Sequence, residues 1–207
     1  MNSRLPAIDE HRLAGLQDGV YSIAMTLLVL ELKLPPIAEP QTNALLWSAL
    51  LSIWPKLMTW LLSFWVLAVF WIGDARAVAT FTVVNRFLLR LSLWRLALVS
   101  LLPFSTAFIG EHGDLVPASA LYAAHLFVLA ATQTTRHLYL RSHPSAASWP
   151  DQAGVKDAGL QAFATLACAA AAFGLAFVVP GYNMLALLPL LLLRFFAKGA
   201  GRATDAA

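Results

Sequence analysis

The residues whose types could do chemistry in this chain are few, and they interrupt apolar sequence. Asp18 is the only formally charged residue between Gly15 and Leu30. Arg95 interrupts another apolar run, and His125 interrupts a third, with Tyr122 one helical turn before it. An acid, a base and an imidazole in such settings are typical of a proton relay, a metal site or polar contacts that hold helices together.

These three groups lie singly in separate apolar runs of the sequence, which bears on whether they form a metal site or polar contacts between helices. No other His or Cys lies at ligand spacing from His125 in the apolar runs, so we predict a hydrogen-bonded packing histidine, with no metal or other cofactor. A carboxylate at the centre of a bilayer costs roughly 2.5–3.5 kcal/mol, so Asp18 needs partners. Arg95 is the predicted partner. Arg12 is a weaker alternative, because six positions turn about 240° around a helix. Asp18 then either anchors helix packing or takes part in conduction or gating.

The composition identifies an integral membrane protein. Of the 207 residues, 59% are hydrophobic and only 12% are charged, whereas a soluble domain carries about 25% charged residues. This leaves no room for a soluble catalytic domain, and the chain has no recognisable catalytic triad or phosphate-binding loop, so we expect no enzyme. Basic residues are scattered singly, which argues against a nucleic-acid partner. Cys168 is the single cysteine, so no disulfide can form within the chain.

The order of apolar and polar segments predicts an all-α fold, a membrane bundle of six spanning helices with a short interfacial helix between the first two spans. The predicted spans are 12–34, 55–72, 91–109, 116–138, 158–179 and 182–197, and the interfacial helix is 42–54. Pro55 divides a run that is too long for one bilayer core of ~30 Å. The polar stretches 73–90 and 141–157 are expected to be loops. Residues 1–11 would be a cytoplasmic lead, 12–197 a single membrane domain and 198–207 a cytoplasmic tail.

The distribution of positive charge predicts the orientation. Only Lys33 and Lys56 fall on the side opposite the N-terminus, and Arg95 lies within a span. The other basic residues fall on the N-terminal side: Arg4, Arg12, Arg76, Arg86, Arg90, Arg136, Arg141, Lys156, Arg194, Lys198 and Arg202. The positive-inside rule then places both termini of this multi-pass protein in the cytoplasm, beneath the cell membrane.

The first predicted span has two kinds of residue at helical spacing. Gly19, Ser22 and Thr26 suit close packing against other helices. A separate stripe of bulky apolar residues consists of Ile23, Leu27, Leu30 and Leu34. Such stripes usually face lipid or a neighbouring helix and only occasionally line a pore, and periodicity alone does not distinguish these cases.

The same span carries a specific motif. The segment RLAGLQDGVYSIAMTLLVLE at 12–31 resembles the signature of the transmembrane protein 175 family of potassium channels in its bacterial single-repeat form, R-x-x-x-F-S-D followed by G-V-x-x-I-x-x-T-L-L-V-L-E. The pairs and triplets LSF at 62–64, FW at 70–71 and PF at 103–104 also fall where the family has similar residues. The resemblance covers roughly the first half of the chain.

Four positions depart from the family pattern. Leu16 and Gln17 stand where the signature has Phe and Ser, Asp74 stands where a histidine is usual, and Ser92 stands where an asparagine is usual. In the family these positions belong to the polar network that holds the first helix in place.

The resemblance implies a homotetrameric, potassium-permeable cation channel in the lipid bilayer, with a pore lined by the first helix of each subunit. Ile23, Leu27 and Leu30 match the pore constriction, which would act as gate and selectivity element, with Thr26 as a polar contributor. The positions that match the signature and would anchor the helix are Arg12, Leu16, Gln17, Asp18 and Arg95. A small-solute secondary transporter and a non-conducting membrane scaffold are the alternatives.

Overall fold

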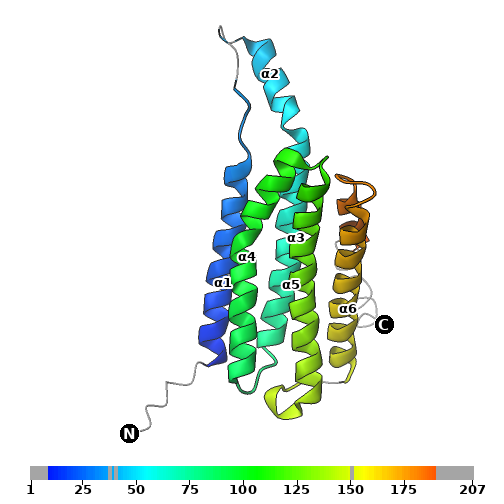
Figure 1. The fold of residues 1–207 in the computed structure, drawn as a ribbon. Helices are drawn as coiled ribbons and strands as arrows, with labels where there is room; N and C mark the ends of the chain where they lie inside the picture. Colours follow the sequence, from blue (N-terminus) through cyan, green and yellow to red (C-terminus); the bar gives the residue numbers. More distant parts are fainter. Residues whose placement is uncertain (1–8, 37–38, 40–41, 150–151, 190–207) are drawn as a thin grey trace, which may run out of the picture.

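The computed structural model describes residues 9–36, 39, 42–149 and 152–189, and this part of the chain is helical (Figure 1). Five of its helices are long and apolar enough to cross a membrane. They are α1 (Glu10–Leu27), which continues as the 3₁₀ helix η1 (Leu28–Glu31), then α3 (Trp54–Val78), α4 (Arg86–His112), α5 (Val116–Ser142) and α6 (Gln152–Leu175). The prediction of an all-α protein with several membrane-spanning helices is confirmed for the described residues.

Local sequence explains where several of these helices begin. The Asp9 carboxylate accepts a hydrogen bond from the backbone N–H of Arg12 at 2.8 Å and caps α1. Asn85 caps α4 in the same way, through the N–H of Leu88 at 2.9 Å. Pro55 lies in the first turn of α3, where its missing N–H removes no helical hydrogen bond. Each cap satisfies a backbone donor that the helix itself leaves unpaired.

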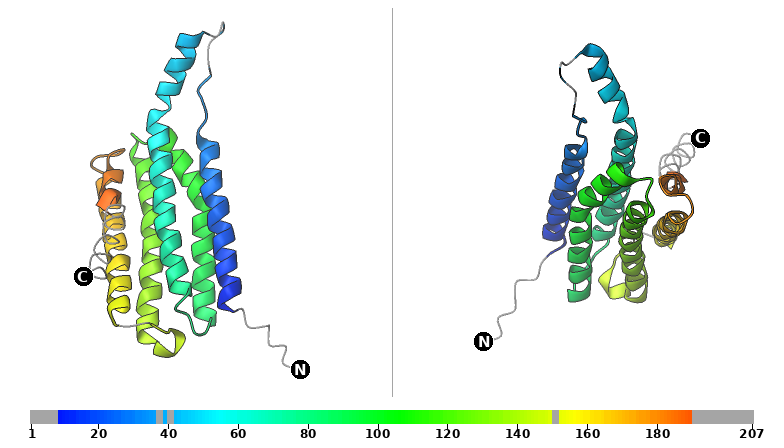
Figure 2. Two further views of the ribbon diagram at one scale, coloured as in Figure 1. Left: turned by 180° about the vertical axis from the view of Figure 1, so that it is seen from behind. Right: turned by 45° about the horizontal axis from the view of Figure 1, so that its top comes forward.

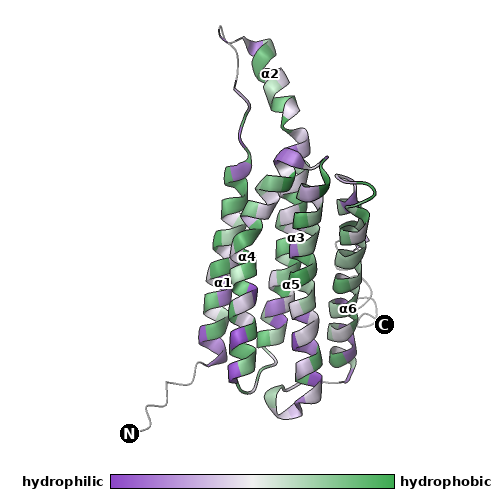
Figure 3. Ribbon diagram, viewed as in Figure 1, coloured by the Kyte–Doolittle hydropathy of each residue, from purple (hydrophilic) through white to green (hydrophobic). Residues whose placement is uncertain are grey.

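The helices form a bundle in which α1 and α6 lie on opposite edges (Figure 2). Helix α1 packs against α3 and α4, and α6 packs against α5. The main core lies between these helices and includes Tyr21, Phe70, Leu102 and Leu126. Figure 3 shows apolar residues along the length of the spanning helices and polar ones gathered at the end where α1 begins.

A separate helix, α2 (Asn43–Ser52), projects beyond the bundle (Figure 1). Thr42 caps it through the N–H of Leu45 at 3.3 Å. Of its residues only Ala49 is buried, and Trp47 and Leu51 are exposed. The sequence prediction of a helix at 42–54 agrees with this element, and its position at the membrane surface stays a prediction.

The predicted boundaries around 73–90 and 141–157 are wrong. Helix α3 continues through Asp74 and Arg76 to Val78, and α4 already begins at Arg86. Likewise α5 extends to Ser142 and α6 begins at Gln152. The prediction ended the second span before Asp74 and the fourth before Arg141, whereas α3 and α5 continue past these residues.

The predicted turn at Pro180 and Gly181 is present. Gly181 has a φ of 84°, a left-handed conformation that glycine adopts without a Cβ clash. Its N–H donates to Ser119 Oγ at 2.9 Å, which ties the turn to α5. The 3₁₀ helix η3 (Asn183–Leu187) follows. Residues 190–197 of the sixth predicted span, residues 1–8 of the lead and the tail 198–207 lie outside the described part, so six spans and the domain limits stay predictions.

Candidate functional site

Helix α1 has one buried face, and it differs from the faces that its sequence suggested. The buried residues Leu13, Gln17, Tyr21, Ala24 and Leu28 recur at helical spacing and face α3 and α4. These residues include neither the small and hydroxyl set nor the bulky stripe. Gly19, Ser22 and Thr26 are all exposed within the single chain, so they pack against none of its own helices, and their packing against helices of another subunit stays a prediction.

The bulky stripe is exposed along the outer side of α1 and η1. Relative exposure is 60% for Ile23, 41% for Leu27 and 62% for Leu30, and Leu34 beyond them is also exposed. Within this single chain, α1 therefore presents a continuous apolar face to its surroundings at an edge of the bundle (Figure 2).

Thr26 lies on the same exposed side as this stripe. Its hydroxyl donates to the carbonyl oxygens of Ser22 at 3.1 Å and Ile23 at 2.9 Å. This back-bonding satisfies the hydroxyl proton inside the helix and leaves the oxygen lone pairs as the polar group on that side.

The predicted pairing of Asp18 with Arg95 is wrong. Asp18 Oδ1 accepts a hydrogen bond from the indole N–H of Trp71 at 2.8 Å, and both side chains are exposed. Arg95 is fully buried and binds Asp74 instead. The prediction failed because Asp74 was assigned to a loop, so Asp18 was the only intramembrane acid left for Arg95. The contact from Asp18 to Trp71 still connects α1 to α3.

Asp74 is the centre of a buried ion cluster. Its carboxylate contacts Arg95 Nη2 at 2.8 Å and Arg136 Nη2 at 2.8 Å. It also accepts hydrogen bonds from Arg95 Nε at 3.2 Å and from the Tyr21 hydroxyl at 2.6 Å. The cluster therefore links α1, α3, α4 and α5 through one carboxylate, a strongly directional set of charge-assisted hydrogen bonds.

Arg95 has further acceptors, which explains how it can be buried. Its Nη1 donates to the Leu129 carbonyl at 2.7 Å and to Thr132 Oγ1 at 2.6 Å. The guanidinium carbon lies 5.9 Å from the centre of the Phe70 ring, within cation–π range. Removing this arginine would leave Asp74, which accepts the Tyr21 hydrogen bond, without one of its partners, so Arg95 positions α1 through Asp74 and Tyr21.

The signature positions Leu16 and Gln17 point to opposite sides of α1. Leu16 is exposed, whereas Gln17 is only 2% exposed. Neither Gln17 nor the buried Ser92 has a hydrogen-bond partner for its side chain among the described residues. Arg12 is exposed. The anchoring role of these residues stays a prediction.

His125 is a hydrogen-bonded residue of the helix interface, as predicted. Its Nδ1 lies 2.8 Å from Ser105 Oγ and its Nε2 lies 2.9 Å from the Leu98 carbonyl oxygen, both on α4. Tyr122 has a different partner, the hydroxyl of Ser63 on α3 at 2.8 Å. No group of three His, Cys, Asp or Glu residues in the described ranges could hold a metal ion.

Sequence reasoning missed Asp74 and Arg136 as buried residues. A signal was present for the start of α4, because Asn85 is a good N-cap residue, but it does not determine the end of α3, where Asp74 lies. Arg136 lies six residues before the end of α5. From the sequence alone, a basic residue at this position fits the end of a spanning helix and the loop that follows it equally well.

The comparisons with known proteins match this architecture. The family model described as the endosomal/lysosomal potassium channel TMEM175 matches residues 12–103, the region from α1 into α4. A potassium channel of Chamaesiphon minutus is 36% identical over 125 residues, which cover 58% of this chain and 60% of that protein. A potassium channel of Streptomyces collinus is 34% identical over 101 residues, 49% of this chain and 48% of that protein.

The agreement in structure extends over most of the chain. The crystal structure of a lysosomal potassium-selective channel TMEM175 homolog from Chamaesiphon minutus superposes with a TM-score of 0.73 at 26% sequence identity. The superposition covers 90% of this chain and 95% of that one.

The chain is therefore similar to bacterial TMEM175 channels, in sequence over residues 12–103 and in fold over 90% of its length. The family match includes the apolar face of α1, Asp74 and Arg95, and it ends before Arg136. The sequence matches span no more than about 60% of the relatives' lengths, whereas the structural likeness to the Chamaesiphon homolog extends over 90% of this chain.

Proposed function

We propose that this protein is a subunit of a potassium-permeable cation channel, a homotetramer with α1 of each subunit lining the pore. The exposed apolar face of α1 carries the proposal, because Ile23, Leu27 and Leu30 lie together on the outer side of the helix that has the family signature, where helices of other subunits could meet them. The names of the relatives from Chamaesiphon and Streptomyces support potassium as the permeant ion.

The proposed gate is a ring of apolar side chains. Four copies of Ile23, Leu27 and Leu30 around an axis would exclude water from a narrow pore and so block ions, and a wider pore would become wet and conduct. Thr26, on the same side of the helix, would offer its hydroxyl oxygen to a partly dehydrated cation. Selectivity would then follow pore width and the cost of partial dehydration, with no cage of backbone carbonyls.

The buried ion cluster supports the proposal by fixing the opposite side of α1. Tyr21 on the buried face donates to Asp74, and Arg95 holds Asp74 in turn. A helix held in this way can present its exposed face in a defined rotation, as a constriction requires. Asp18 and Trp71 add a contact nearer the start of α1.

The charge distribution supports an orientation with both termini in the cytoplasm. Arg76 near the end of α3, Arg86 at the start of α4 and Arg141 near the end of α5 gather at one end of the bundle. Lys56 lies at the other end, 3.9 Å from Glu111. By the positive-inside rule the first of these ends is cytoplasmic.

Ion flux from proteoliposomes tests the proposal. Wild type should carry K⁺ flux larger than Na⁺ flux, and Ile23→Asn should raise the flux because a polar ring resists dewetting. Val128→Asn is the matched control, since it changes a β-branched, exposed residue on α5, away from α1. Absence of flux from wild type and Ile23→Asn alike would refute the channel, and equal effects of the two substitutions would refute the role of α1.

A further inference from the structure

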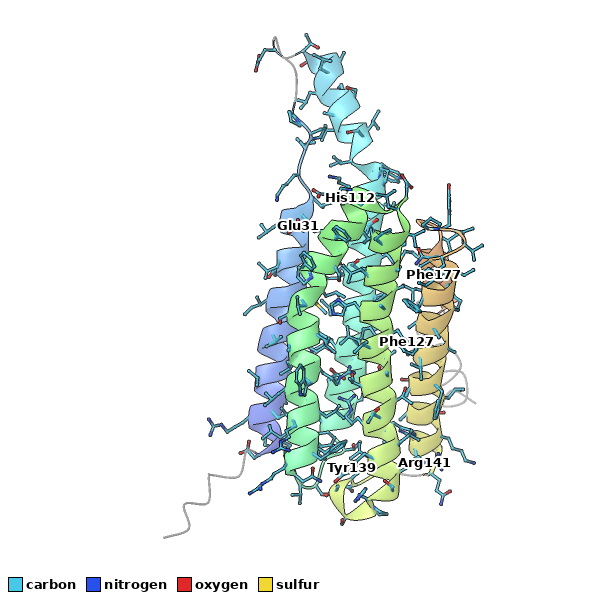
Figure 4. All side chains as sticks on the ribbon, viewed as in Figure 1. Glu31, His112, Phe127, Tyr139, Arg141 and Phe177 are labelled. Carbon is cyan, nitrogen blue, oxygen red and sulfur yellow. The ribbon has the colours of Figure 1, made fainter. Side chains whose placement is uncertain are left out.

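A cavity of about 650 Å³ lies between α3, α5 and α6, away from the exposed face of α1. The residues that line it include Arg76, Gln133, Arg136, His137 and Trp149. The N–H of Ser148 donates to the Thr80 carbonyl at 2.8 Å, which ties the segment before α6 to the end of α3 at the edge of the cavity. It lies toward the end of the bundle where Figure 4 labels Tyr139 and Arg141.

Two buried cationic or potentially cationic side chains of this cavity have unused hydrogen-bonding groups. Arg136 is 2% exposed, and its Nη1 has no partner among the described residues. His137 is 5% exposed, and neither of its ring nitrogens has a partner there. Unpaired buried donors are costly in a protein, and an unpaired guanidinium nitrogen more so.

The ion cluster behind the cavity has more positive than negative charge. Asp74 is the single carboxylate that contacts both Arg95 and Arg136. Two guanidinium groups and one carboxylate leave one positive charge uncompensated in the interior. Since isolated buried charges are strongly disfavoured, an anion that reaches Arg136 from the cavity would complete the cluster.

The remaining lining of the cavity fits an amphiphilic ligand. Arg76 adds a second guanidinium, and the first turn of α6, with Gly154, adds the positive end of a helix dipole. Asp157 also lines the cavity and is its one described carboxylate. It forms no ion pair with Arg136, whose ion-pair partner is Asp74. The alanine side chains in the lining leave apolar surface for hydrocarbon: Ala77, Ala79, Ala158 and Ala162.

His137 and Trp149 form one side of this cavity. A Cβ at Gly159 would lie 2.8 Å from His137 Nε2, so the absence of a side chain there lets the imidazole approach α6. The His137 ring packs edge-on against Trp149, with centroids 6.0 Å apart and planes at 76°. These two side chains separate the cavity from a neighbouring one of about 760 Å³ that Arg141 and Lys156 line.

We propose that this cavity binds a phosphate group, either the headgroup of an anionic phospholipid or a soluble phosphate, through Arg136, Arg76 and His137. Arginine recognises phosphate with paired N–H groups, and basic pockets between membrane helices are known to hold anionic headgroups. The proposal does not depend on ion conduction.

Binding to the purified full-length protein tests it. Delipidated protein is titrated with phosphatidylglycerol or phosphatidylcholine in mixed micelles, and separately with inorganic phosphate against chloride at equal ionic strength. Bound lipid is counted by native mass spectrometry and Tm is followed by tryptophan fluorescence. Phosphatidylglycerol should bind and raise Tm, whereas phosphatidylcholine should not, because a ligand of the folded state alone stabilises it. A saturable effect of inorganic phosphate would assign the site to a soluble anion, and an effect of phosphatidylglycerol alone would assign it to lipid.

The variants are matched in charge and exposure. Arg76→Gln removes an exposed arginine that lines the cavity, and Arg86→Gln removes an exposed arginine at the start of α4 outside it. Loss of one charge-assisted hydrogen bond should weaken binding roughly tenfold or more in Arg76→Gln and leave Arg86→Gln unchanged. Arg136→Gln, which leaves Asp74 and Arg95 as a neutral pair, should abolish the Tm shift.

Three results would overturn the proposal. They are an absence of binding of both phosphatidylglycerol and inorganic phosphate to wild type, equal shifts from phosphatidylglycerol and phosphatidylcholine, and equal losses in Arg76→Gln and Arg86→Gln.

Discussion

Replacing Asp74 with asparagine should destabilise the bundle more than any other single loss of a carboxylate in the described part of the chain. The carboxylate is buried and holds both Arg95 and Arg136 at 2.8 Å, with Tyr21 at 2.6 Å. Asparagine keeps one acceptor oxygen and no charge, so two buried guanidinium groups would lose their counter-ion. Breaking a buried ion pair in this way costs about 3–5 kcal/mol, which is a large part of the stability of most domains.

The assay is unfolding by SDS titration in mixed micelles, followed by tryptophan fluorescence. Asp18→Asn is the matched control, because Asp18 is exposed and its one described hydrogen bond comes from Trp71. Its loss should cost at most about 1.5 kcal/mol. The double variant Asp74→Asn with Arg136→Gln restores the original net charge of the cluster, so it should be more stable than Asp74→Asn alone.

Two results would refute this reasoning. If Asp74→Asn unfolded at the same SDS fraction as wild type, the cluster would not contribute to stability as the geometry implies. If the double variant were no more stable than Asp74→Asn, the cost would come from lost packing or hydrogen bonds and not from unpaired positive charge.

Two further substitutions test the packing between helices. Gly159→Ala should be less stable than Gly174→Ala on the same helix by roughly 1 kcal/mol, because its new Cβ would lie 2.8 Å from His137 Nε2 and force the imidazole to move, whereas the Cβ at Gly174 meets nothing within 4 Å. Thermal unfolding of both variants measures the difference. Tyr122→Phe should cost about 1–3 kcal/mol because it leaves the buried Ser63 hydroxyl without its partner at 2.8 Å. Adding Ser63→Ala should recover much of that loss, and a double variant less stable than the single one would contradict it.

The sequence predicted the spanning helices better than it predicted their ends. Apolar runs are long and their lengths are set by bilayer thickness, so the existence of α1, α3, α4, α5 and α6 followed from hydropathy. Their ends depend on which charged residues leave the membrane and which are paired inside it. Asp74 looks like a loop residue in isolation, and it is buried because it is paired with Arg95 and Arg136.

At the candidate site, too, the sequence predicted some features and missed others. The spacing of Ile23, Leu27 and Leu30 identified a common stripe, and the structure shows all three exposed. Periodicity could not identify the opposite face, because Gln17 and Tyr21 are polar or amphipathic residues that are buried there. The burial of Tyr21 follows from the hydrogen bond to Asp74, a contact between residues 53 positions apart that no local pattern contains.

The most direct test of the proposed channel is a density map of the full-length assembly in lipid nanodiscs, obtained by single-particle electron cryomicroscopy. The account predicts four copies of the chain around one axis, with Ile23, Leu27 and Leu30 of each α1 facing that axis. A monomer, or an assembly in which this face of α1 is covered by lipid on the outside, would contradict it.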